Sequence, residues 1–278
     1  MKTTNSRLAS RIKLGSLVVA ALFAFSSIAN ATVLRVTVEN NASPGGLSFT
    51  PVFAAFHSAD YDAFDVGGTA SDGLEAIAEL GMIGGLQSEL ASADPNAVSS
   101  PIFPDAGMRP LFAGESGSAT FEIDDPASNM FFTFLSMILP SNDTFFGRDD
   151  AAQIFDTSGN YLGNQVFQIT GADLYDAGTE ALDIMTAPFI PGNDAGASPE
   201  DSNTSIRPAE ALDAFAGLTL ANGSVLDASL IDFLSNPSAF NVATITIERV
   251  NAPSAFAMML LLAGGFIFRA KLFQHKAL

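Results

Sequence analysis

The stretch that decides the fold is FFTFLSMILPSND, residues 131–143. Its first nine residues, 131–139, are predominantly apolar and show no regular alternation with polar residues. A run of this length is typical of a central β-strand that is buried on both faces. Pro140 stops the strand, because proline has no backbone N–H to donate to a neighbouring strand. The stretch therefore predicts a buried strand that ends in a turn carrying Asp143.

Other segments alternate between apolar and polar residues, which indicates half-buried strands. These segments are VLRVTVEN (33–40), ATFEIDD (119–125) and VATITIERV (242–250). Two apolar runs around Ser158-Gly159-Asn160 predict a hairpin over residues 154–169. The region between the two chain ends therefore begins and ends with a strand, as many β-sandwiches do.

Helices are expected to be few and short. Residues 71–81, SDGLEAIAELG, place apolar side chains on one helix face, with capping residues before them and a glycine after them. A loop followed by a short helix is expected at residues 199–218. Pro, Gly, Ser and Asp are frequent at residues 87–118 and 186–210, which predicts long loops. We therefore expect an all-β fold, an antiparallel β-sandwich with short helices and long loops, over residues 32–250.

The N-terminal end predicts secretion. Residues 1–31 combine a basic start, an apolar run at 14–28 and the cleavage pattern Ala29-Asn30-Ala31. This order is typical of a signal peptide that begins as an apolar helix and is removed on export. The mature chain is expected to begin near Thr32.

The C-terminal end, residues 251–278, holds the uncharged run AFAMMLLLAGGFIF (255–268), followed by Arg269, Lys271 and Lys276. This order resembles bacterial C-terminal sorting tails of the PEP-CTERM kind, with NAPS standing where those tails have Pro-Glu-Pro. An apolar helix here implies sorting or anchoring at the envelope and association with a membrane. The alternative is a terminal helix buried in the domain.

The charge of the chain lies almost entirely between these ends. Seven of the 12 Lys and Arg residues fall in the two ends, and all 30 Asp and Glu fall between them, so residues 32–250 carry a net charge of −25. Such a surface repels nucleic acid, whose binding requires a basic face. It attracts divalent cations. With no Cys and only two His, a thiolate site and a zinc site with several His ligands are excluded.

The sequence contains no G-x-S-x-G, H-E-x-x-H, Walker A or G-x-G-x-x-G pattern. Paired carboxylates keep open a hydrolase that acts on extracellular polysaccharide. We expect no enzymatic activity, because chance acid pairs are common in so acidic a chain. His57 is interpreted as a structural residue whose ring is hydrogen-bonded, rather than as a base.

The segment YDAGTEALD, residues 175–183, crowds Asp176, Glu180 and Asp183 together with no Lys or Arg among them. A solvated acidic loop is one reading. The other is a calcium site, because calcium takes six to eight oxygen ligands from flexible loops. Asp143, at the end of the buried strand, is a further oxygen donor. Composition alone leaves both readings open.

Five segments together resemble the spondin N-terminal domain, known from F-spondin and mindin and from secreted bacterial proteins. In chain order they are FHSADYDAFDVGGTASDGLEAIAELG (56–81), FLSMILPSND (134–143), YDAGTE (175–180), IRP (206–208) and VATITIERV (242–250). The resemblance extends over residues 33–250. It implies an extracellular β-sandwich that binds one calcium ion at its end.

The resemblance also implies the metal ligands. They map to Asp143, Asp176 and Glu180, with Glu180 standing where the animal proteins have Asp. The animal domains carry Trp after the P-S-x-D turn, and cysteines, whereas this chain has Thr144 and neither residue type. Animal partner surfaces are therefore not carried over.

The combined expectation is a secreted, calcium-stabilised module of the adhesion or extracellular-matrix type, without enzymatic activity. Its partner is expected to be an extracellular glycan or a matrix or surface protein, and not nucleic acid. The location is outside the cell or at the bacterial envelope. The alternatives are a polysaccharide hydrolase that uses paired carboxylates and a purely structural envelope protein.

Overall fold

The buried strand predicted from residues 131–139 is β6 (Phe131–Leu139), and all of its residues after Phe131 are buried. One face of β6 points between the two sheets through Phe132, Phe134 and Ile138, while Leu135 points to a second apolar cluster under the helices. The polar side chains of β6 have hydrogen-bond partners: Ser136 Oγ donates to Thr50 O over 2.7 Å. A strand without a solvent face is therefore formed as the sequence predicted.

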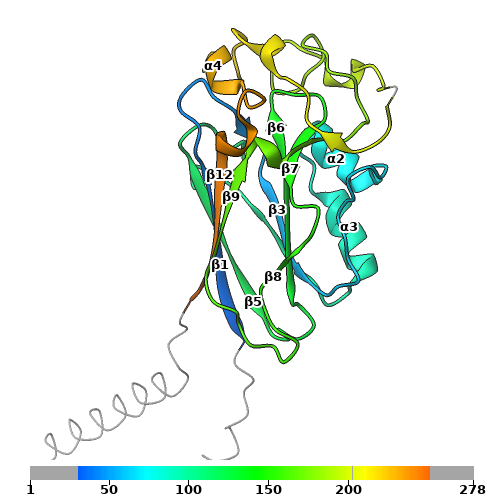
Figure 1. Cartoon of the computed structure of the whole chain (residues 1–278), viewed down its shortest axis with the longest axis vertical. Helices are drawn as coiled ribbons and strands as arrows, with labels where there is room; N and C mark the ends of the chain where they lie inside the picture. Colours follow the sequence, from blue (N-terminus) through cyan, green and yellow to red (C-terminus); the bar gives the residue numbers. More distant parts are fainter. Residues whose placement is uncertain (1–30, 202, 251–278) are drawn as a thin grey trace, which may run out of the picture. The chain divides into compact units, whose positions relative to one another are not determined.

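The computed structural model describes residues 31–201 and 203–250, which form two antiparallel sheets packed face to face (Figure 1). The predicted all-β antiparallel sandwich is confirmed. The predicted C-terminal segment, and the signal peptide apart from Ala31, lie outside the described residues. Among the described residues, no helix is both long and apolar enough to cross a membrane.

The smaller sheet has four strands in the order β5 (Ser116–Ile123), β1 (Thr32–Asn40), β12 (Asn241–Arg249) and β9 (Gln165–Thr170). β1 and β12 are antiparallel, with Leu34 opposite Arg249 and Asn40 opposite Ala243. The first and last strands of the domain are therefore neighbours, and the described chain begins and ends at the same end of the sandwich (Figure 1).

The larger sheet has β6 at its centre. Its main path is β11 (Arg207–Pro208), β10 (Leu174–Asp176), β7 (Thr144–Gly147), β6, β3 (Val52–His57) and β4 (Val98–Ile102). Two short strands, β2 (Ser48–Phe49) and β8 (Ala152–Gln153), also pair with β6. β6 thus forms backbone hydrogen bonds with four strands.

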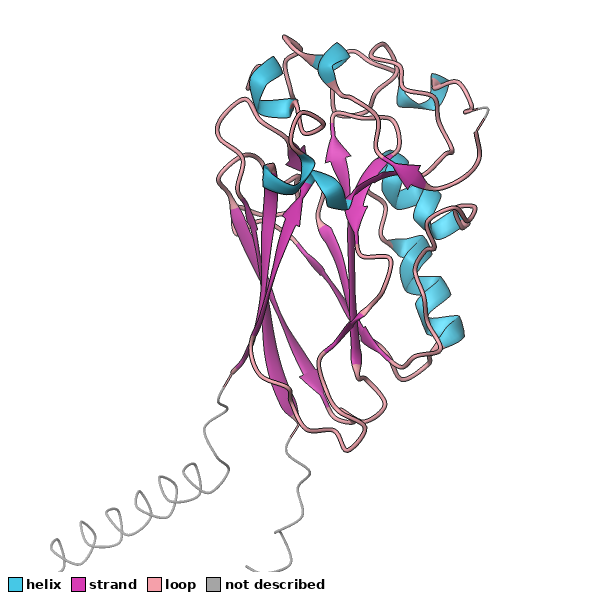
Figure 2. Ribbon diagram, in the orientation of Figure 1, coloured by secondary structure: helices cyan, strands magenta, loops and turns pink. Residues whose placement is uncertain are grey.

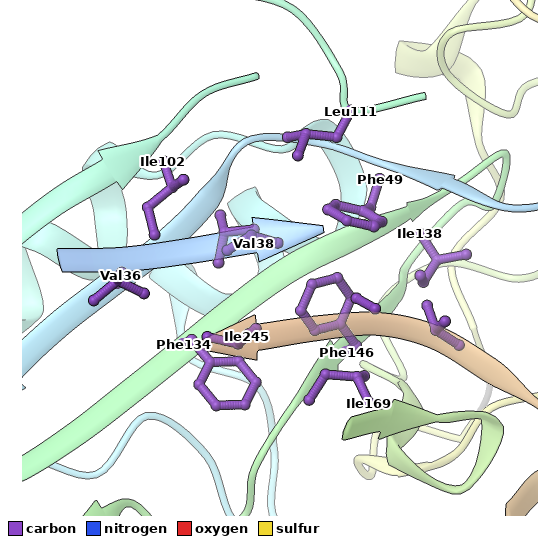
Figure 3. Packing of buried hydrophobic residues seen from close by; sticks show 14 of the residues in the cluster. Val36, Val38, Phe49, Ile102, Leu111, Phe134, Ile138, Phe146, Ile169 and Ile245 are labelled. Carbon is purple, nitrogen blue, oxygen red and sulfur yellow. The ribbon is translucent and has the colours of Figure 1, made fainter. Parts of the chain in front are cut away.

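Phenylalanine fills the space between the sheets. Phe49 and Phe146 meet edge to face with ring centroids 5.1 Å apart, as do Phe56 and Phe121. The β1 side chains Val36 and Val38 close the same cluster from the smaller sheet, together with Ile245 (Figure 3). This aromatic packing supplies a large apolar core to a domain without disulfides.

Two helices cover the outer face of the larger sheet (Figure 2). The helix predicted at 71–81 is confirmed as α2 (Asp72–Leu80), which Ser71 caps and Gly81 ends in the left-handed conformation. The loop predicted at 87–118 is wrong in part, because it contains most of α3 (Gly84–Ala93) as well as β4. α3 buries only Leu86 and Leu90, too few apolar residues for a clear helical pattern.

Two other predicted segments differ in detail. A bridge between Phe155 and Tyr161 closes the predicted hairpin, but β9 pairs with β12 instead of returning along the first run. The short helix expected within 199–218 is a single 3-10 turn, Asp213–Phe215, and a further short helix, α4, spans Ala228–Ile231.

The close approach of β5 to the end of β4 gives a first prediction. A Cβ at Gly117, in β5, would collide with the backbone oxygen of Phe103, just after β4, whereas a Cβ at Gly84 would meet nothing within 4 Å. Gly117→Ala should lower the free energy of unfolding by about 2 kcal/mol or more, because neither backbone segment can move away without breaking its pairing. Urea denaturation measures the change.

Gly84→Ala is the matched control. Gly84 is the first residue of α3, so the substitution should be neutral or stabilise by less than about 1 kcal/mol through lower chain entropy. Equal effects of the two substitutions would contradict the packing described at Gly117.

Candidate functional site

The site begins at the turn that follows β6. Ser141 Oγ donates to Ile138 O over 2.7 Å and accepts from the backbone N–H of Thr144 over 3.0 Å, so the turn is held at both ends. The turn buries Asp143, whose exposed fraction is 1%. Asp143 therefore lies at the end of the buried strand, as the sequence predicted, but in the interior and not in a solvated turn.

Asp143 is bonded to the acidic segment from the later part of the chain. Its Oδ2 accepts from the backbone N–H groups of Thr179 (3.0 Å) and Glu180 (3.2 Å), and its backbone oxygen accepts from Ala177 N. Gly178 makes the necessary turn with φ +71°, and a Cβ there would lie 2.7 Å from Asn203 O. Hydrogen bonds to Asp143 thus hold the segment 177–180 against the end of β6.

Asp176 is the last residue of β10, and it is buried. It lies opposite Thr144 on β7 and opposite Arg207 on β11, so the two neighbouring strands fix its position. Its Oδ1 accepts from Gly178 N over 2.8 Å, and its Oδ2 accepts from Arg207 Nη2 over 2.9 Å. Asp176 therefore already has one cationic partner within the protein.

Arg207 was not expected at the site. Its Nη2 also contacts Asp201 and Glu210, and its Nη1 donates to Asn203 O over 2.9 Å. A single guanidinium thus joins Asp176 to the segment 201–210. No spacing rule could have indicated this, because Arg207 lies 31 positions after Asp176 in the chain.

Burial raises the pKa values of both aspartates, and nearby carboxylates raise them further, Asp201 acting on Asp143 and Asp143 acting on Asp176. Burial raises the pKa of Asp143, although the N–H groups of Thr179 and Glu180 oppose the shift. Burial and then the charge of Asp143 raise the pKa of Asp176 to about 7, against the attraction of Arg207. The guanidinium of Arg207 therefore does not cancel the effects of burial and of the neighbouring carboxylate on Asp176.

Glu180, the third predicted ligand, contacts Asp143 through its backbone. Its side chain is half-buried, and burial, followed by the charge of Asp143, raises its pKa while a hydrogen bond with Ser198 lowers it. Across residues 31–201 and 203–250, no three side chains of His, Cys, Asp or Glu converge closely enough to hold a metal ion. The joint coordination by Asp143, Asp176 and Glu180 stays a prediction.

Asp183, the last acid of the segment, has a local structural role. Its Oδ1 accepts from Met185 N over 2.9 Å, and its own N–H donates to Asn142 Oδ1 over 2.8 Å. These bonds close a turn, which is the usual use of aspartate in a loop. Asp183 therefore holds a turn of the loop in place.

A cavity of about 430 Å³ adjoins the segment, and five carboxylates line it, with no Lys, Arg or His among the lining residues. The five are Glu75, Glu79, Glu180, Glu200 and Asp201. Burial, and after it the charges of Glu180 and Glu75, raise the pKa of Glu79 to about 7. The cavity places α2 opposite the acidic segment.

The sequence of α2 contains one signal for this cavity. Glu75 and Glu79 are four residues apart on α2, and no basic residue lies in the last turn of that helix. Like charges at this spacing repel, and acids near a helix C-terminus oppose the helix dipole. Glu75 lies in the favourable first turn, but its repulsion with Glu79 and the position of Glu79 near the helix end are locally unfavourable, which indicates a shared role outside the helix.

The donor set fits a hard cation in its chemistry. Every charged side chain that lines the cavity supplies oxygen, and calcium prefers carboxylate and carbonyl oxygens held in loops. The ion pair between Asp176 and Arg207 opposes the fit, because it occupies one oxygen of a predicted ligand. Binding would therefore use the remaining oxygens or displace the guanidinium.

His57 lies away from this site and is fully buried. Its Nδ1 is 2.6 Å from Ser58 O, and its Nε2 is 2.8 Å from Thr133 Oγ1. Burial lowers the pKa of His57. Both ring nitrogens have partners, which agrees with the structural role expected from the sequence.

Comparison with known families gives one match. The family model described as Spondin_N matches residues 41–212, more than half of the chain. The match includes α2, β6, β7, β10 and β11, which are the elements that carry the residues above. No curated protein matches the chain.

The raised pKa of Asp176 predicts how stability depends on pH without added metal. Because folding raises this pKa from 3.8 to about 7, the folded state holds the proton more tightly. The resulting stabilisation is complete below about pH 4 and is lost as the pH rises through about 7. Asp176→Asn should remove this loss, so its free energy of unfolding should fall less than that of the wild type.

Chemical denaturation in chelator, at several values across this pH window, measures the difference between the two proteins. Parallel pH profiles would show that Asp176 does not carry a raised pKa in the folded state.

Proposed function

Because the chain belongs to the Spondin_N family, we propose that it is a secreted, calcium-stabilised binding module of the adhesion or extracellular-matrix type. The coarser part of this statement, a spondin-like domain of an extracellular type, follows from the family. The calcium, the secretion and the binding role are the proposal. We further propose that the module has no enzymatic activity.

The observation that carries the calcium proposal is the buried pair Asp143 and Asp176. Both lie at the end of the sandwich beside a cavity lined by acids, and the charge of one raises the pKa of the other. Asp143, Asp176 and Glu180 would hold the ion. When bound, calcium would supply positive charge that reduces the repulsion among these groups.

Contacts within the chain hold the loops near the proposed calcium site in fixed positions. Asp143 fixes the segment 177–180 through two backbone N–H groups, and Arg207 holds the carboxylates of Asp201 and Glu210 and the carbonyl of Asn203. Three separate stretches of chain are thereby held at one end of the sandwich. Loops on a rigid scaffold are the usual place for recognition.

The partner is proposed to be an extracellular glycan or a matrix or surface protein. The net charge of −25 over residues 32–250 disfavours nucleic acid and anionic lipid as partners of the domain itself. Residues 1–31 support export, and residues 251–278 support retention at a bacterial envelope or membrane. The roles of both ends are proposed from the sequence alone.

A second candidate function is favoured by Glu79. A carboxyl group with a pKa of about 7 in an acidic cavity has the property of a general acid in glycoside hydrolysis. A purely structural envelope protein is the third candidate. A hydrolysis assay on extracellular polysaccharide separates the second from the first, and a glycan-binding assay separates the first from the third.

The calcium proposal predicts a shift in melting temperature. Millimolar calcium should raise the melting temperature above its value in chelator by a few degrees, since extracellular modules bind calcium at roughly 10⁻⁴ to 10⁻³ M. Asp176→Asn should abolish most of this increment, because it removes one ligand charge with little change in shape. Thermal unfolding with each protein in calcium and in chelator measures the increment.

Asp94→Asn is the matched control. Asp94 is also buried and accepts two backbone N–H bonds, from Ser58 and Asn96, but neither donor lines the cavity, whereas Gly178, which donates to Asp176, does. Its variant should keep the calcium increment even if it melts at a lower temperature. If calcium raised the melting temperature equally in the wild type and both variants, or if magnesium raised it as much as calcium, the proposed site would be contradicted. The effect would then be general screening of the negative charge of the domain.

Removing residues 251–278 gives a separate prediction. The last strand, β12, ends at Arg249, and Val250 N donates to Val33 O over 2.8 Å. The truncated chain should therefore unfold at the same urea concentration as the full chain and differ only in its location. Fractionation of cells that express both forms tests the location, and unfolding of the truncated form at lower urea would show that the tail belongs to the domain.

A further inference from the structure

Asparagine triplets of the N-glycan acceptor pattern, Asn-X-Ser/Thr, occur four times within the described residues. They begin at Asn41, Asn142, Asn203 and Asn222. A transferase must reach the side-chain nitrogen of the asparagine, so exposure and hydrogen bonding decide which triplets are competent in the folded protein. The structure separates the four into two pairs.

In the first pair the side-chain nitrogen is already a donor. Asn142 is fully buried, and its Nδ2 donates to Thr186 Oγ1 and Ser198 Oγ. Asn41 is exposed, but its Nδ2 donates to Asn241 Oδ1 and Thr244 Oγ1, both over 2.8 Å. Each nitrogen would have to lose two hydrogen bonds before it could react.

In the second pair the asparagines are exposed, and the hydroxyl of the third residue in the triplet donates to the carboxamide oxygen. Ser205 Oγ lies 2.9 Å from Asn203 Oδ1, and Ser224 Oγ lies 2.7 Å from Asn222 Oδ1. Within the described part of the chain, neither Nδ2 donates a hydrogen bond. Negative charge develops on the oxygen as the nitrogen loses its proton, and a donor fixed there stabilises that charge.

The backbone around these two sites leaves room for a bulky group. Asn222 lies at the tip of a turn that a bridge between Thr219 and Val225 closes, and a Cβ at Gly223 would meet nothing within 4 Å. Asn203 precedes Thr204, which lines the acidic cavity. A modification at Asn203 would therefore lie at the edge of the candidate cation site.

We propose that Asn203 and Asn222 are acceptors for N-linked glycans in the folded protein, and that Asn41 and Asn142 are not. The donor is a glycan carried on a polyprenyl diphosphate. A bond forms between Nδ2 and the anomeric carbon, and the bond from that carbon to the diphosphate oxygen breaks. Nδ2 releases one proton, and the diphosphate leaves with the electron pair. The transfer uses no cation held by this chain, so the assignment stands apart from the calcium proposal.

The test uses the purified folded chain, a single-subunit oligosaccharyltransferase that accepts any Asn-X-Ser/Thr triplet, and a polyprenyl-diphosphate-linked glycan. Peptide mass spectrometry measures occupancy at each asparagine; Asp-specific cleavage isolates Asn222 in the peptide 213–226. Transfer to Asn203 and Asn222 should exceed transfer to Asn41 and Asn142 by at least about tenfold, because two hydrogen bonds protect each of the latter.

Matched substitutions check that transfer occurs at these two triplets. Ser205→Ala and Ser224→Ala should abolish transfer to Asn203 and Asn222 respectively, whereas Ser205→Thr and Ser224→Thr should keep it. The urea-unfolded chain should accept at all four asparagines, which shows that the fold and not the triplet makes the difference. Equal transfer to Asn41 in the folded chain, or none to Asn203 and Asn222, overturns the proposal; transfer to only one of them overturns the other assignment.

Discussion

The burial of β6 on both faces is the constraint on which the rest of the structure depends. A strand with no solvent face needs an apolar layer on each side, and here the smaller sheet supplies one and the helices α2 and α3 supply the other. Because four strands pair with β6, its end also fixes the end of the larger sheet. The position of Asp143, three residues after Pro140, follows from this one strand.

The elements that could be predicted are those whose local pattern and tertiary environment agree. β1 and β12 show the expected alternation, and β6 is predominantly apolar along its length. The sequence of α2 is flanked by residues that cap both of its ends. α3 could not be predicted, because it starts with two glycines and is held by a tertiary contact. A Cβ at Gly85 would lie 2.7 Å from Gly73 Cα, so the two helices approach more closely than any pattern in either one reveals.

The candidate site was predictable only in part. Asp143 and Asp176 were found through the family motifs, and the structure brings them together beside the segment 177–180. The partners that set their electrostatics come from far away in the chain. Arg207 reaches Asp176 through the pairing of β10 with β11, and Glu79 reaches the cavity through the packing of α2 on β6. Neither the contact of Arg207 with Asp176 nor the position of Glu79 at the cavity can be inferred from spacing along the sequence.

The antiparallel pairing of β1 with β12 has a consequence for how the domain is presented. Leu34 lies opposite Arg249, so both ends of the described chain leave the sandwich at one pole. Asn40, at the opposite pole, bonds Leu47 O next to β2, which pairs with the last two residues of β6. An anchor attached after Val250 would therefore hold the domain at the pole opposite the acidic loops. If residues 251–278 anchor the chain as proposed, the acidic loops would lie at the pole away from the anchor, and the length of the sandwich would separate the two.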